Sequence, residues 1–139
     1  MSSHSCHEWI SFTTPKLYWG DAGLALHLGG VPEPTGAHLE NLVLHDLLCW
    51  RDARVERSEI LYWRTAAGEE VDFVVEAGRQ LVPIEVKATP RPRLRDAGPL
   101  RAFHAEYGKA ARAGLLLHTG STLEWLAPDV LAVPWWRVC

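Results

Sequence analysis

Apolar residues recur at helical spacing in the first half of the chain, between about residues 37 and 50. They form one stripe made of Leu39, Val43, Leu47 and Trp50. This stripe predicts a helix that packs along one face. Glu40 lies within the stripe, because the residues three, four and seven positions after it are all apolar. A carboxylate in such surroundings is partly desolvated, which is unfavourable unless a positive group meets it. Glu40 is therefore a candidate functional residue.

Three short runs rich in β-forming residues follow this helix. The predicted strands are 60–64, 71–76 and 81–88. Their close spacing, with turn residues between them, predicts an antiparallel meander. Along the second strand, simple alternation places Val71, Phe73 and Val75 on one face and Asp72 and Val74 on the other.

Shorter patterns flank the helix and the three strands. Residues 17–19 are strand-like, and Asp21 is placed to cap a short helix after them. Pro90 and Pro92 end the third strand, and a second helix is predicted from about residue 96 or 99 to residue 107. Further strands are predicted at 114–118, 123–126 and 130–133. The order predicts an α/β fold with an αβββαβ core, a mixed sheet flanked by helices.

Length and composition limit the organisation of the chain. A chain of 139 residues, 47% of them hydrophobic, suits one compact core. Residues 1–14 lack periodicity and are predicted to be an N-terminal tail, which leaves 15–139 as one domain. Cys49 lies in the apolar helical run and is predicted to be a small buried residue. Burial is also predicted for four tryptophans in apolar runs, Trp19, Trp63, Trp135 and Trp136.

Cysteine usage and hydropathy bear on the compartment. Three cysteines without motif spacing argue against a disulfide framework, which fits a reducing environment. No apolar stretch is long enough to span a bilayer. We therefore expect a cytoplasmic protein without a membrane partner.

The distribution of charge singles out one segment. The formal net charge is −3, so no general positive surface exists to bind nucleic acid nonspecifically. Between Lys87 and Arg101, however, five basic residues stand against one acid. A solvated connector and a phosphate-contacting segment explain this run equally well. Its central arginines, Arg91, Arg93 and Arg95, are the candidate nucleic-acid contacts.

The strand residues suggest a metal site. Glu85 and Lys87 are two apart on the third strand and therefore share a face. If the second and third strands pair, Asp72 neighbours Glu85, and two such carboxylates repel unless a cation lies between them. Mg²⁺ or Mn²⁺ prefers oxygen ligands of this kind. A Glu-x-Lys triplet on a solvated strand face is also common, so only the combination with Glu40 carries weight.

This combination resembles the PD-(D/E)XK nuclease superfamily, and is most similar to the C-terminal domain of unknown function of prokaryotic AAA-type ATPases. The resemblance covers 15–136. It rests on the segments 16–24, 36–48, 62–64, 70–74, 83–88, 100–103 and 134–136. It implies a restriction-endonuclease-like core, with Glu40 as the helix carboxylate, Asp72 and Glu85 as metal ligands, and Lys87 as the catalytic lysine.

The resemblance also implies an activity and partners. It implies a metal-dependent nuclease or phosphodiesterase, with DNA favoured over RNA, and an ATPase domain or another protein as a possible partner. The alternative is a catalytically silent module of the same fold that binds nucleic acid or a protein. The sequence lacks the Gly-x-x-x-x-Gly-Lys-Ser/Thr loop that holds nucleotide phosphates. We therefore expect either a free-standing remnant or the C-terminal piece of a longer protein, without ATPase activity of its own.

Overall fold

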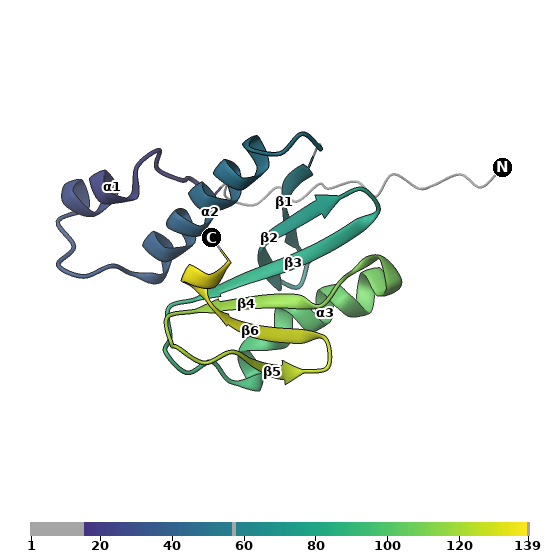
Figure 1. Cartoon of the computed structure of the whole chain (residues 1–139). Coiled ribbons are helices and arrows are strands. Elements are labelled where there is room, and N and C mark those ends of the chain that lie inside the picture. The colour runs from purple at the N-terminus through teal and green to yellow at the C-terminus, as the bar shows by residue number, and fades with distance from the viewer. Residues whose placement is uncertain (1–15, 57, 139) are drawn as a thin grey trace.

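The computed structural model describes residues 16–56 and 58–138 (Figure 1). The tail predicted at 1–14 lies outside them. The helices are α1 (Ala22–Gly29), α2 (Gly36–Asp52) and α3 (Gly98–Tyr107), with 3-10 turns η1 (Leu94–Ala97), η2 (Gly108–Ala110) and η3 (Trp135–Arg137). The strands are β1 (Ser58–Arg64), β2 (Glu70–Ala77), β3 (Gln80–Lys87), β4 (Gly114–His118), β5 (Glu124–Ala127) and β6 (Val130–Pro134).

The six strands form one mixed sheet in the order β1-β2-β3-β4-β6-β5. The first three pair antiparallel, which confirms the predicted meander. The chain then crosses through α3, so that β4 pairs parallel to β3 and β6 parallel to β4, while β5 closes the edge antiparallel. A parallel pair needs such a crossover because its strand ends lie at opposite edges. The predicted α/β class and element order are confirmed.

Helices cover both faces of the sheet (Figure 1). On one face, α2 packs Leu39, Val43 and Leu47 against a cluster that includes Phe73 and Ile84. On the other face, α3 packs Leu100 and Phe103 against a second cluster, which includes Trp63, Val71 and Leu116. The sheet is thus a layer between helices on its two faces.

A bulge in β2 breaks the alternation expected along that strand. Leu61 pairs with Val74 but Trp63 pairs with Val71, so two steps on β1 correspond to three on β2. Val71 therefore packs with Val74 on the α3 face, whereas simple alternation placed it with Phe73. That prediction was wrong, because an inserted residue moves the following side chain to the other face. Asp72 lies within the bulge.

Other local predictions had mixed outcomes. Asp21 caps α1 as expected, its carboxylate accepting from the Leu24 amide at 2.8 Å. Residues 17–19 are not a strand. Cys49 is exposed, and so is Trp50, whose ring lies under the Arg54 guanidinium on the last turn of α2. Trp63 is buried as predicted, but Trp19 and Trp136 are exposed. Within the described part of the chain, no helix is long and apolar enough to cross a membrane.

Candidate functional site

The site begins where the pairing of β2 and β3 ends. The last paired residues are Phe73 and Ile84. Beyond them, the Asp72 side chain replaces the backbone carbonyl that would otherwise accept a hydrogen bond from β3. Its Oδ2 accepts the backbone N–H of Val86 at 2.9 Å. Asp72 is only 7% exposed, and this bond ties its carboxylate to the neighbouring strand. The bulge and the strand end together place Asp72 beside β3.

Glu85 and Lys87 form an ion pair on β3. Lys87 Nζ lies 2.6 Å from Glu85 Oε1. Glu85 is 3% exposed, and its other oxygen, Oε2, is buried with no hydrogen-bond partner in the described residues. An unpartnered buried carboxylate oxygen is costly. The structure therefore holds one carboxylate oxygen in need of a donor or a cation.

Burial and charge perturb this pair. Burial, and then the nearby charge of Asp72, raise the pKa of Glu85 to about 7, against the opposing effect of Lys87. Burial alone would lower the pKa of Lys87, but the hydrogen bond and charge of Glu85, together with the charges of Asp72 and Asp96, outweigh burial and raise that pKa above its ordinary value. Lys87 is therefore protonated at neutral pH. It is suited to stabilise negative charge and not to remove a proton.

A second lysine joins the remaining carboxylates. Lys16 Nζ lies 2.9 Å from Asp72 Oδ1 and 3.0 Å from Glu40 Oε1. The Tyr18 hydroxyl donates to the same Glu40 oxygen at 2.6 Å. The positive group that Glu40 requires is thus Lys16. Neither Lys16 nor Tyr18 was predicted from the sequence, although the anomalous position of Glu40 signalled a missing cation.

The Lys16 cluster extends to β1 and β2. Glu70 Oε1 lies 3.7 Å from the Lys16 ammonium, and the ring of Tyr62 lies beneath it at 5.1 Å. Burial lowers the pKa of Lys16, but hydrogen bonds and charges from Asp72 and Glu40 outweigh burial and raise it overall. Burial, followed by the hydrogen bond to Glu40, raises the pKa of Tyr18. Both side chains therefore stay protonated, with Glu40 as their shared acceptor.

The two lysines separate the acids that were predicted to act together. Glu40 and Asp72 meet through Lys16, whereas Glu85 contacts Lys87. Across residues 16–56 and 58–138, no three His, Cys, Asp or Glu side chains are grouped so that they could hold a metal ion. Asp72 is the residue common to both clusters, since it contacts Lys16 directly and raises the pKa of Glu85.

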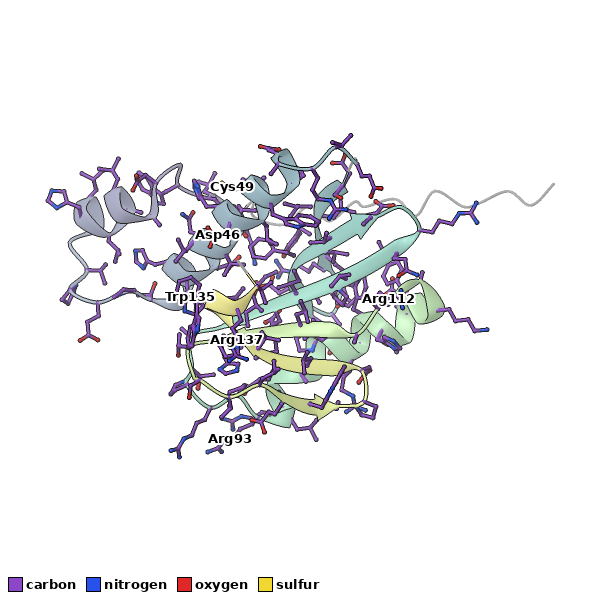
Figure 2. The ribbon with its side chains drawn as sticks, in the orientation of Figure 1. Asp46, Cys49, Arg93, Arg112, Trp135 and Arg137 are labelled. Carbon is purple, nitrogen blue, oxygen red and sulfur yellow. The ribbon has the colours of Figure 1, made fainter. Side chains whose placement is uncertain are left out.

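The three predicted arginines line a surface groove next to Lys87. The groove has a volume of about 380 Å³. Its lining residues are Lys87, Ala88, Thr89, Arg91, Arg93, Arg95 and Asp96. All three arginines are exposed. Figure 2 shows Arg93 on the segment that leads from β3 to α3, with its side chain directed away from the sheet. The groove thus presents an excess of positive charge beside the Glu85–Lys87 pair.

Backbone contacts hold this arginine segment against the loop after β4. The amide of Thr119 donates to the Thr89 carbonyl at 3.0 Å. At Gly120 an added Cβ would overlap the Pro90 carbonyl, so the close approach of the two loops requires glycine there. The buried ring of His118 accepts the Gly120 amide at 3.0 Å and fixes the same loop. The groove wall is therefore anchored to the sheet.

Residues 35–138 match the family described as a domain of unknown function, DUF4143. The chain belongs to this family. No curated protein and no solved structure matches it. The matched segment contains Glu40, Asp72, Glu85 and Lys87, together with the arginine segment. Lys16 and Tyr18, which bind Glu40, precede it.

Proposed function

We propose that this DUF4143 domain is a metal-dependent, nuclease-like phosphodiesterase with a restriction-endonuclease-like core. One observation carries the proposal: the Asp72–Glu85–Lys87 set lies at the end of paired strands and adjoins the groove lined by three arginines. Phosphodiester cleavage requires anion binding next to groups that stabilise charge on phosphorus. The antiparallel meander followed by a helix and a parallel strand supports the proposed core.

The acids suit a hard divalent ion in one respect. Glu85 Oε2 is buried without a hydrogen-bond partner in the described residues, and it lies near the Asp72 carboxylate. Mg²⁺ is commonly held by one or two carboxylates together with substrate phosphates. We propose Asp72 and Glu85 as the ligands of Mg²⁺ or Mn²⁺; Glu40, the third predicted ligand, reaches Asp72 only through Lys16 and could join them only if Lys16 moved away. When bound, the ion supplies Lewis-acid stabilisation of a phosphate.

Lys87 has an electrostatic role in this proposal. Its ammonium is half-buried beside Glu85 and at the rim of the groove, so a phosphate in the groove lies within its field. A fixed positive charge stabilises the transition state more than the ground state when phosphorus gains negative charge. Lys87 therefore acts on the chemical step, and Arg91, Arg93 and Arg95 act on binding of the nucleic-acid backbone.

The test is a cleavage assay on single- and double-stranded DNA, and on RNA, with Mg²⁺ or Mn²⁺. We expect the chain to cleave DNA in preference to RNA. Lys87→Ala should slow cleavage by about a hundredfold, as expected for loss of one electrostatic contact, while DNA affinity changes little. Lys109→Ala, which removes an exposed lysine of η2, is the matched control and should cleave like the wild type.

The arginines give a second readout. Replacing Arg91, Arg93 and Arg95 with alanine should weaken DNA binding and make it less salt-dependent, because fewer phosphates are neutralised. Binding that does not depend on salt would show that these arginines do not contact the DNA. Folded wild type that binds DNA without cleaving it under any of these conditions would contradict the nuclease proposal. That result would favour the silent nucleic-acid-binding module. Binding to a protein partner or an ATPase domain, without DNA binding, would favour a catalytically silent module that binds protein.

A further inference from the structure

The segment that carries Lys16 is held in place by α2. Asn41, which is 4% exposed, accepts the Trp19 amide through Oδ1 at 2.8 Å and donates to the Trp19 carbonyl through Nδ2 at 3.2 Å. The ring of His45 contacts the same carbonyl at 2.8 Å. A side-chain amide thus satisfies both backbone groups of Trp19, which explains why this segment lies extended without joining the sheet. The position of Lys16 is fixed from the helix that also carries Glu40.

The Lys16 ammonium lies among oxygen atoms, as a bound cation does. Glu40, Asp72 and Glu70 contribute one oxygen each, at 3.0, 2.9 and 3.7 Å. The Lys16 side chain is 27% exposed, and that of Asp72 only 9%. An ammonium offers three donors and no acceptor, so it suits a position surrounded by carboxylates. One positive charge thereby offsets part of the negative charge of Glu40 and Asp72.

In this arrangement each oxygen of Asp72 already accepts one hydrogen bond. Oδ1 accepts from Lys16 and Oδ2 accepts from the Val86 amide. A divalent ion that binds Oδ1 would lie close to the Lys16 ammonium, and two cations at that distance repel each other. The Val86 amide belongs to the strand and cannot move far, whereas the Lys16 side chain can rotate about its own bonds. Displacement of Lys16 is the easier change.

We propose that Lys16 is a built-in cation of the carboxylate site, and that a divalent metal ion binds Asp72 in competition with its ammonium. The inference deepens the proposed function and rests on it for the identity of the competing ion. It predicts that the wild-type site binds metal weakly and that removal of the Lys16 charge strengthens binding.

The experiment measures Mn²⁺ binding to the full chain by isothermal titration calorimetry and by the metal-dependent shift in Tm. Lys16→Met removes the charge and keeps much of the length, and Lys16→Gln is the second variant because its amide still donates to a carboxylate. We expect both to bind Mn²⁺ at least tenfold more tightly than the wild type. Mn²⁺ should also raise their Tm by more. Adding Asp72→Asn to either variant should abolish the gain.

Matched controls separate this effect from a general change in charge. Lys109→Met removes a lysine of η2 and should bind Mn²⁺ like the wild type. Lys16→Arg keeps the charge and should also bind weakly. Equal Mn²⁺ affinity in Lys16→Met, Lys16→Gln and the wild type, or no binding in any of them, would overturn the competition.

The outcomes also distinguish this inference from the proposed function. If the wild type cleaves DNA with Mg²⁺ while the Lys16 variants show no gain in Mn²⁺ affinity, the nuclease proposal stands and the competition is wrong. If the variants gain affinity through Asp72 but no protein cleaves nucleic acid, the competition stands and the nuclease proposal is wrong.

Discussion

The two lysine–carboxylate clusters at this end of the sheet are built in different ways. Glu85 and Lys87 belong to one strand and lie two residues apart, so the strand repeat alone brings them together. Lys16 reaches Glu40 and Asp72 across separations of 24 and 56 residues, and Asn41 and His45 hold its segment on α2. The first cluster faces a groove with further positive charge, whereas the second is closed by its own lysine.

The two clusters are therefore suited to different roles. The Glu85–Lys87 pair keeps an unpartnered oxygen and a neighbouring basic groove, so it is the part of the site equipped to meet a ligand. The Lys16 cluster already contains a cation that offsets part of its negative charge, and it joins the segment 16–19 to α2 and β2. Asp72 connects the two, which makes it the residue through which a change in one cluster reaches the other.

The largest expected effect comes from Asp72 itself. Asp72→Ala leaves the partly buried Lys16 ammonium without its closest acceptor and removes the acceptor of the Val86 amide. Losing one partner of such a pair should lower the free energy of unfolding by about 4 kcal/mol, measured by urea denaturation. Asp52→Ala, which breaks an exposed pair on α2, should change stability little. Equal effects of the two substitutions would mean that Asp72 does not connect the clusters.

A smaller effect concerns the pH dependence of the Glu85 pair. The folded state raises the pKa of Glu85 from 4.5 to about 7, so it binds this proton more tightly than the unfolded chain does. Stability should therefore fall as pH rises from about 4.5 to 7, then level off. Glu85→Gln removes this loss, so its stability relative to the wild type should rise by roughly 3 kcal/mol across that window.

Thermal unfolding in EDTA at several pH values between these limits checks the Glu85 effect. Glu124→Gln on the exposed face of β5 is the control and should follow the wild type at every pH. If the difference in stability between Glu85→Gln and the wild type did not depend on pH, the pKa of Glu85 would not be raised.

The smallest expected effect concerns the contribution of the Tyr18–Glu40 hydrogen bond to stability. Tyr18→Phe removes the hydroxyl that donates to Glu40 at 2.6 Å but keeps the ring that lies near Phe73. The free energy of unfolding should fall by about 1.5 kcal/mol, as for a hydrogen bond to a charged group. Tyr62→Phe, which removes an exposed bond to Glu70, should have a smaller effect. The reverse order would show that the cluster is held from β1 and not from α2.

Local patterns in the sequence determined much of this protein. The apolar stripe of α2, the alternation in β3 and the turns between the first three strands are properties of neighbouring residues. They were enough to predict the order of elements, the mixed α/β class and the adjacency of Glu85 and Lys87. The stripe also marked Glu40 as a carboxylate in need of a positive partner, although it did not identify that partner.

Only the tertiary structure decided which charges meet. The bulge at Asp72 depends on the pairing of β2 with β1, and a one-residue shift changes the face on which a side chain lies. The segment that carries Lys16 is held by Asn41, which lies 22 residues away from Trp19 in the sequence. Such contacts join distant parts of the chain, and no repeat in the sequence encodes them. Short-range periodicity therefore predicted the elements, and long-range packing determined the electrostatics of the site.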